Sequence, residues 1–219
     1  MDLKEIRKTE IDAQVNERKE KVINAAFQCF CKKGIEATSI NEIAKEAQIG
    51  VASVYRYFEN KETIVLQCGK QFWQMAKENL LALSESEQMR DKTALEKVRV
   101  FLDYAIEIYL KHRQYFCYLH DMDNFIISHR VEDMGMLEYE ENISAIAQVC
   151  IATVEEGKQD GSITYDAQAE EIYRTVNSIL IGVMEKMSLG AVIQGDALVE
   201  HKRQLEIIAD FIIEGLKSK

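Results

Sequence analysis

The sequence predicts an all-α protein. Proline is absent from its 219 residues, although average usage of about 5% would supply several, and proline disrupts helix interiors. Apolar residues recur at helical spacing along most of the chain, as in the face formed by Val22, Ala26 and Phe30. No segment alternates between polar and apolar residues as a half-buried strand does. These three observations together favour long, uninterrupted helices.

Cap and turn residues divide the first part of the chain into four expected helices. Gly34 is a helix stop, because glycine adopts the left-handed conformation that ends many helices. Ser39 and Glu42 have the spacing of a capping box and open a short second helix. A third helix is expected over 51–58, and a longer fourth helix over 61–83.

The remainder of the chain is also predicted to be helical. After a polar break at 84–91, Thr93 and Glu96 form a second capping box. An aromatic-rich stretch follows over 115–125, and a further helix is expected over 139–156.

Two last helices are expected near the carboxyl end of the sequence. Gly157 and Gly161 indicate a turn before them. Asp166 and Asp196 are the expected N-caps of helices over 167–189 and 197–217.

The charge is distributed unevenly. Residues 1–62 contain equal numbers of acidic and basic side chains, so the net charge of −10 is carried entirely by the rest of the chain. A neutral head on an acidic body is compatible with nucleic-acid binding through the head alone.

Several classes of protein are disfavoured. No apolar run reaches the roughly 20 residues of a membrane span, and no secretory signal opens the chain, so we expect a cytoplasmic protein without a membrane partner. The five cysteines form no CxxC pair and the four histidines no HxxxH or HExxH unit, which predicts no metal and no cofactor. No nucleophile–base pattern or phosphate loop is present, so we do not expect an enzyme.

The strongest functional signal lies in residues 38–62. Two short helices joined by a tight turn and preceded by an apolar helix are typical of a helix-turn-helix, whose second helix has the dimensions to enter a major groove. Residues 18–66 resemble the TetR family of bacterial transcriptional regulators. The matching elements are Gly34, Thr38-Ser39, Ile43-Ala44, the segment Val54-Tyr55-Arg56-Tyr57-Phe58 and Asn60-Lys61.

The sequence departs from the family pattern at two positions. Gln48 stands where the family usually has the turn glycine, which suggests a slightly different turn. Ala52 stands where glycine or proline is common, which bears on base preference.

The resemblance implies a set of DNA-contacting residues: Thr38, Ser39, Asn41, Val51, Ala52, Ser53, Tyr55, Arg56, Tyr57 and Lys61. Structural interpretations compete for several of them. Ser39 is equally suited to capping, and a helix N-terminus with such a cap also attracts phosphate. Val51 fits the small core of the head, and tyrosines at helical spacing commonly pack. Lys61 has the alternative of a surface lysine without a role.

The resemblance also implies a two-domain organisation. The expected DNA-binding domain covers 1–62, with an amino-terminal arm over 1–16, and the larger helical ligand-binding and dimerisation domain covers 63–219. The expected dimer interface comprises Ile172, Val176, Ile179, Val183, Leu205, Ile208 and Ile212, for which burial within the monomer is the alternative.

The middle of the chain is rich in aromatic residues. The family hollows this region into a pocket, and apolar pockets are lined by such side chains. The expected ligand-binding residues are Trp73, Tyr104, Tyr109, Tyr115, Phe116, Tyr118, Met122 and Phe125, with ordinary core packing as the alternative. Glu107 and Asp121 suggest tolerance of a cation.

The sequence thus predicts a ligand-responsive, dimeric DNA-binding transcriptional regulator. We expect a repressor that a small molecule releases from a palindromic operator. The alternative is a DNA-binding protein of the same fold without a small-molecule inducer, controlled by a protein partner or acting in chromosome organisation.

Overall fold

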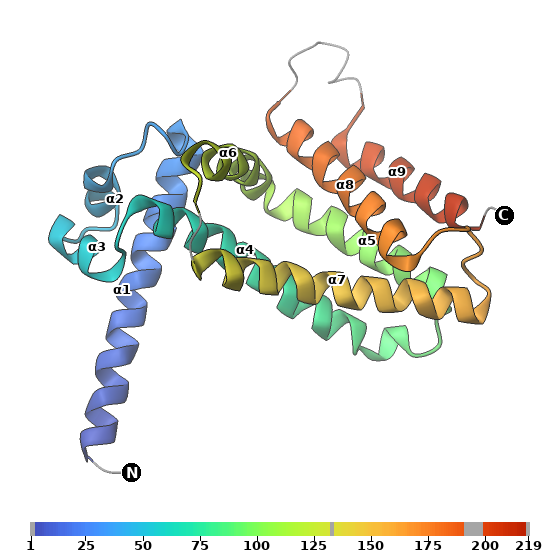
Figure 1. The fold of residues 1–219 in the computed structure, drawn as a ribbon, viewed down its shortest axis with the longest axis horizontal. Helices are drawn as coiled ribbons and strands as arrows, with labels where there is room; N and C mark the ends of the chain where they lie inside the picture. Colours follow the sequence, from blue (N-terminus) through green and yellow to red (C-terminus); the bar gives the residue numbers. More distant parts are fainter. Residues whose placement is uncertain (1–2, 132–133, 191–198, 218–219) are drawn as a thin grey trace. The chain divides into compact units, whose positions relative to one another are not determined.

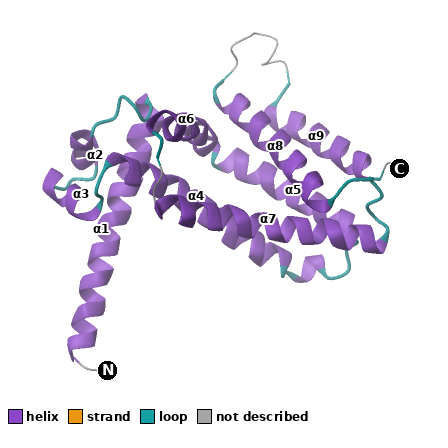
Figure 2. Ribbon diagram, in the orientation of Figure 1, coloured by secondary structure: helices purple, strands orange, loops and turns teal. Residues whose placement is uncertain are grey.

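A computed structural model describes residues 3–131, 134–190 and 199–217. This described part consists of helices joined by loops and contains no strand (Figure 1, Figure 2), which confirms the predicted all-α fold. The helices in chain order are α1 (Leu3–Lys33), α2 (Ile40–Glu46), α3 (Val51–Tyr57), α4 (Lys61–Ser84), the short 3-10 helix η1 (Glu87–Met89), α5 (Ala94–Lys111), α6 (Arg113–His129), α7 (Met134–Asp160), α8 (Ala169–Ser188) and α9 (His201–Leu216).

Contacts within the chain define two compact units. The first unit comprises residues 1–71 and 118–139, and the second unit comprises residues 72–117 and 140–219. Helices α4, α6 and α7 therefore each supply residues to both units. The predicted functional division after Glu62 stays a prediction.

Helix α1 contributes one face to the core of the first unit. Val22 and Phe30 on this face are at most 1% exposed. The helix ends where Gly34 adopts a φ of +85° and its N–H donates to the carbonyl of Phe30 at 2.8 Å. The expected arm over 1–16 is instead helical from Leu3 onward. Its many Lys, Arg, Glu and Gln residues have high helix propensity, which accounts for this correction.

Both predicted capping boxes are present. The N–H of Glu42 donates to Ser39 Oγ at 3.4 Å, and the N–H of Ser39 donates to Glu42 Oε2 at 2.9 Å. The N–H of Glu96 donates to Thr93 Oγ1 at 3.4 Å, and the N–H of Thr93 donates to Glu96 Oε2 at 2.8 Å. These bonds fix the starts of α2 and α5.

The turn between α2 and α3 is a Schellman motif. The N–H of Ile49 donates to the carbonyl of Ala44 at 3.0 Å, and the N–H of Gln48 donates to that of Lys45 at 3.2 Å. Gln48 takes a φ of +57°, in the left-handed region that glycine adopts without strain. The departure from glycine at this position therefore keeps a left-handed turn but adds backbone strain.

We expect Gln48→Gly to raise the free energy of unfolding of the first unit by about 0.5–1 kcal/mol, because glycine removes the left-handed strain. The measurement is urea unfolding followed by circular dichroism. Gln48→Ala is the matched control, since alanine shortens the side chain but keeps a Cβ at a positive φ. An equal gain in both variants would show that backbone strain is not the cause.

Tyr118 joins three helices in the first unit. Its ring centroid lies 5.4 Å from that of Phe27 and 6.0 Å from that of Phe30 on α1. Its hydroxyl donates to the carbonyl of Val65 on α4 at 2.6 Å. Helices α1, α4 and α6 therefore meet around this buried side chain.

Helices α5, α8 and α9 pack together in the second unit (Figure 1). Leu102 and Ile106 on α5, Leu180 on α8, and Leu205 and Ala209 on α9 are all buried. This arrangement is the framework for the cavity described below.

The structure confirms the predicted turn at Gly161, whose φ is +76°, and corrects the one at Gly157. Helix α7 continues through this residue to Asp160, and Gly157 is buried. A Cβ at this position would lie 2.5 Å from Cδ1 of Ile163. The glycine therefore permits close packing of the following loop rather than ending the helix.

The starts of the last two helices also differ from expectation. Helix α8 begins at Ala169 with Gln168 as its N-cap, so Asp166 is not the cap. Helix α9 begins at His201, and the expected cap Asp196 lies outside the described residues.

Candidate functional site

Helix α3 has one buried and one exposed face. Val54 is fully buried and Phe58, which follows the helix, is 4% exposed. On the other face Ala52, Tyr55 and Arg56 are exposed, with Tyr55 at 55%. The helix is thus held through its apolar side and presents a methyl group, a phenol and a guanidinium to the outside.

The predicted DNA contacts around α2 and at the start of α3 differ in accessibility. Thr38 is only 2% exposed, and its hydroxyl donates to a backbone carbonyl at 2.8 Å. Because this side chain holds the loop after α1, we do not retain it among the proposed contacts. Ser39 and Asn41 are exposed, whereas Val51 and Ser53 are half-buried.

Two guanidinium groups converge on Tyr57. Arg56 Nη2 donates to the Tyr57 hydroxyl at 2.9 Å, and the Arg56 guanidinium carbon lies 5.0 Å from the tyrosine ring centroid. Arg18 on α1 also hydrogen-bonds this hydroxyl. The bonds from Arg18 and then Arg56 lower the pKa of Tyr57 from its ordinary value. Two exposed positive charges therefore lie at one end of α3.

Arg18 is a candidate contact that sequence reasoning missed. It lies on α1, and the hydrogen bond to Tyr57 brings its side chain to α3. No local spacing pattern relates the two residues, because the packing of α1 against the helix-turn-helix determines their approach. Two signals for Arg18 were available. It lies within residues 18–66, which resemble the family, and it lies on the exposed side of α1.

Lys61 opens α4 and is half-buried. Its Nζ donates to the carbonyl of Glu36 at 3.2 Å and lies 5.6 Å from the ring centroid of Phe125. Burial lowers its pKa, since desolvation disfavours the charged form, while the carboxylates of Glu36 and Glu62 oppose that shift. The ammonium group is therefore partly buried and already bonded within the protein, and its contact with a phosphate stays a prediction.

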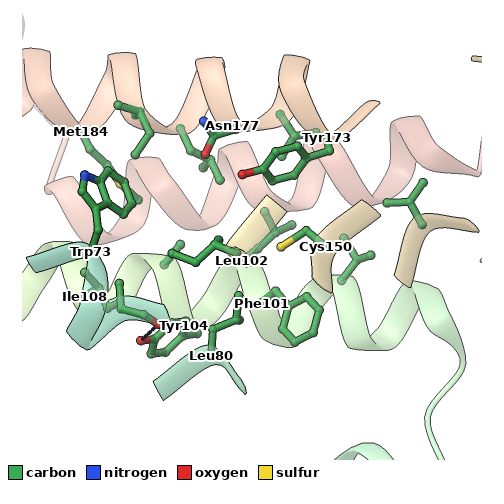
Figure 3. A pocket seen from close by; sticks show the side chains of 18 of the residues that line it. Trp73, Leu80, Phe101, Leu102, Tyr104, Ile108, Cys150, Tyr173, Asn177 and Met184 are labelled. Carbon is green, nitrogen blue, oxygen red and sulfur yellow. Dashed lines mark hydrogen bonds between the residues drawn. The ribbon is translucent and has the colours of Figure 1, made fainter. Parts of the chain in front are cut away.

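The second unit contains an apolar cavity (Figure 3). Its volume is about 150 Å³. Residues of α4, α5, α6, α7, α8 and α9 line it. A largely apolar lining with a few polar groups is typical of a small-molecule site.

Three of the predicted ligand-binding residues, Trp73, Tyr104 and Phe116, line this cavity. The Tyr104 hydroxyl donates to the carbonyl of Ala76 at 3.1 Å, so this phenol is already hydrogen-bonded. Figure 3 shows Tyr104 on the side of the cavity opposite Tyr173 and Asn177, and Trp73 beside Met184.

The other predicted ligand-binding residues do not line the cavity. Tyr109 is fully buried and shares a hydrogen bond of 2.8 Å with His201 Nδ1. Tyr115 stacks on Phe72 with ring centroids 4.7 Å apart. The remaining residues belong to the first unit and are buried there: Tyr118, Met122 and Phe125. Their hydrophobicity serves packing, so for this set the structure corrects the prediction.

The predicted dimer residues also divide by burial. Ile179 on α8 is 43% exposed, whereas Ile172 and Leu205 are buried inside the second unit and are not retained. Phe211 on α9, which was not predicted, is 72% exposed. The half-buried members of the set are Val176, Val183, Ile208 and Ile212.

The described residues hold no group of three histidine, cysteine, aspartate or glutamate side chains that could bind a metal ion. Among the same residues, no helix is long and apolar enough to cross a membrane.

Comparisons with known proteins agree with this geometry. Residues 22–68 match the family described as bacterial regulatory proteins, tetR family. The uncharacterized HTH-type transcriptional regulator YerO of Bacillus subtilis (strain 168) is 34% identical over 71 residues, which are 32% of this chain. The aligned segment spans only 25% of the length of YerO.

Solved structures extend the similarity to the whole fold. A regulatory protein in the tetR family from Rhodococcus RHA1 superposes with a TM-score of 0.71 at 12% identity, covering 92% of this chain and 98% of that one. AibR in complex with isovaleryl coenzyme A and operator DNA superposes with a TM-score of 0.62 at 15% identity, covering 92% and 100%.

The helix-turn-helix and the helical body after it define the class of helix-turn-helix transcriptional regulators. Within that class, residues 22–68 match the TetR family of bacterial regulatory proteins, and the whole fold is similar to that of a solved TetR-family structure.

Proposed function

We propose that this regulator binds a palindromic operator as a homodimer, represses transcription, and is released by a small molecule bound in the cavity of the second unit. The observation that carries the DNA-binding part is the exposed face of α3. Tyr55 and Arg56 extend from a helix whose opposite face is buried, and Arg18 adds a second cation beside them. We propose that the protein acts in the cytoplasm.

Several groups on or beside α3 have a chemical counterpart on DNA. The Ala52 methyl group suits contact with a thymine methyl, and the Ser53 hydroxyl can hydrogen-bond several base edges. Tyr55, Arg56 and Arg18 suit phosphate oxygens, which positions the protein without specifying sequence. Ser39 adds a hydroxyl at the N-terminus of α2.

We expect Lys61→Ala to weaken binding to all DNA sequences alike and to lower the salt dependence by about one phosphate contact for each head. We expect a moderate loss of DNA affinity, because the ammonium group already donates to the Glu36 carbonyl. The measurement is fluorescence anisotropy of labelled duplexes at several salt concentrations. Lys111→Ala removes an exposed lysine from the second unit and is the control. Unchanged affinity and slope in Lys61→Ala would contradict the proposed docking.

The exposed apolar side chains of α8 and α9 support the dimer proposal. Ile179 and Phe211 present large apolar surfaces, and a Cβ at Gly182 would meet no atom within 4 Å. A second copy packed on these helices would bury this surface, and each buried side chain of this kind contributes about 1.5–3 kcal/mol.

We expect Phe211→Glu to shift the dimer toward monomer at micromolar concentration, because a carboxylate would be placed in an apolar interface. Sedimentation velocity measures the distribution. Leu110→Glu is the matched control, since Leu110 is an exposed apolar residue of α5 in the same unit. A wild-type chain that is monomeric when bound to operator would contradict the dimer proposal itself.

Helix α4 offers a route for control by a ligand. It begins at Lys61 in the first unit, and Trp73, Ala76 and Leu80 on the same helix line the cavity. A ligand that binds one position of this helix more tightly than another shifts the population between them. A coupling of about 1–3 kcal/mol would weaken operator binding about 5- to 150-fold. The structure of AibR in complex with isovaleryl coenzyme A and operator DNA supports the proposal that this fold binds both a small molecule and an operator.

A further inference from the structure

The cavity of the second unit carries no charged side chain. None of the residues that line it is an aspartate, glutamate, lysine, arginine or histidine. The lining is formed largely by aliphatic and aromatic groups from six helices, as Figure 3 shows for Leu102, Ile108 and Met184. An ion that enters such a space loses its hydration without gaining an opposite charge.

Polar groups of the lining gather at α8. Tyr173 and Asn177 lie one helical turn apart, and Figure 3 shows the Tyr173 hydroxyl directed toward Asn177, with the Cys150 sulfur beside Tyr173. Within the described part of the chain, neither the Tyr173 hydroxyl nor the Asn177 amide forms a hydrogen bond. Tyr104 differs, because its hydroxyl donates to the Ala76 carbonyl. The cavity therefore offers unused donors and acceptors at one place, here called the polar corner (Tyr173 and Asn177).

The polar corner is uncharged at neutral pH. Burial raises the pKa of the Tyr173 phenol to about 12, and burial raises the pKa of the neighbouring Cys150 thiol to about 12. Both groups therefore stay protonated, and the Asn177 amide does not titrate. A hydroxyl and an amide can together donate to and accept from a neutral oxygen-bearing group.

We propose that the cavity selects a neutral apolar molecule with a single hydrogen-bonding head group, such as an alcohol, ketone, ester or amide, held at the polar corner. This inference rests on the proposed ligand control and specifies its chemistry. It replaces the sequence-based expectation of a cation-tolerant site. Asp121 belongs to the first unit, Glu107 is exposed on α5, and neither lines the cavity.

The test uses decyl compounds that differ only in the head group. Decan-1-ol, decanoate and decylammonium are titrated, below the concentrations at which they form micelles, into the full-length protein without DNA. Trp73 is the only tryptophan of the chain and lines the cavity, so its fluorescence reports binding there. Displacement of N-phenyl-1-naphthylamine, a neutral fluorescent probe, gives a second readout. We expect decan-1-ol to bind at least about tenfold more tightly than either ion.

Variants of the polar corner test the head-group contact. Tyr173→Phe and Asn177→Leu should each weaken decan-1-ol about 3- to 10-fold, the range of one lost hydrogen bond, and leave decanoate unchanged. Ser178→Ala, an exposed neighbour on α8 whose hydroxyl donates to the Arg174 carbonyl, is the control and should bind all three compounds like the wild type. Helicity and thermal unfolding verify that each variant is folded.

The inference is overturned if either ion binds as tightly as decan-1-ol, if decan-1-ol binds in neither readout, or if both corner variants bind it like the wild type. Operator anisotropy with the same compounds separates this failure from that of the proposed function. Selective decan-1-ol binding without operator release would contradict the ligand control and leave the assigned chemistry standing. If decanoate or decylammonium binds as tightly as decan-1-ol and releases the operator, the assigned chemistry is contradicted and the ligand control stands.

Discussion

Replacing Arg56 by glutamate is expected to weaken operator binding by at least about 100-fold, or about 3 kcal/mol. The substitution removes a cation from the exposed end of α3 and places a carboxylate where phosphates approach, and like charges held together cost several kcal/mol. A dimer carries the substitution in both heads, which doubles the loss of binding free energy. The stability of the protein should change by no more than about 0.5 kcal/mol, since Arg56 is exposed.

Anisotropy with a labelled operator duplex measures the loss. Arg174→Glu reverses an exposed charge on α8 in the second unit and is the matched control. Arg18→Glu is predicted to reproduce a large part of the Arg56 effect, because both guanidinium groups bond to Tyr57. Wild-type affinity in Arg56→Glu would show that this face of α3 does not meet DNA.

Truncating Tyr118 should have the largest effect on stability. Tyr118→Ala removes a ring that contacts Phe27 and Phe30 and leaves a cavity between three helices, which costs about 3–5 kcal/mol. Tyr118→Phe keeps the ring and loses only the hydroxyl bond to the Val65 carbonyl. That carbonyl lies inside α4 and has helical hydrogen bonding available, so this change costs only about 0.5–1.5 kcal/mol.

Urea unfolding, followed by circular dichroism, compares the two variants. The first unit should unfold at lower urea in Tyr118→Ala, and DNA binding should fall with it, because the head cannot stay folded. A destabilisation below about 1 kcal/mol in Tyr118→Ala would show that the ring is not central to this core.

Local features of the fold could be predicted from the sequence. The capping boxes at Ser39 and Thr93 and the helix end at Gly34 depend on residues within one helical turn, and the structure confirms them. Of the two glycines predicted to form a turn, Gly161 lies in one, whereas the reason for a glycine at Gly157 is the Ile163 side chain packed against it. Local sequence does not contain that contact.

The candidate sites also contain features that local sequence predicts and features that depend on how the helices pack. The exposed face of α3 follows from helical spacing and from the family resemblance, so Tyr55 and Arg56 were predictable. The pairing of Arg18 with Tyr57 depends on how α1 packs against α3. The cavity could be anticipated from the aromatic content of the middle segment, but its lining could not. Tyr118 and Trp73 look equally suited in sequence, yet they lie in different units.

The most direct test of the central claim, that the head binds operator DNA through α3, is a salt titration of binding to the duplex upstream of the protein's own gene. Anisotropy between 50 and 200 mM salt gives the number of phosphates contacted. With about four or more phosphates engaged, affinity should fall about 100-fold or more across this range, and a scrambled duplex should bind more weakly throughout. Equal binding of the two duplexes, or an affinity independent of salt, would contradict the account.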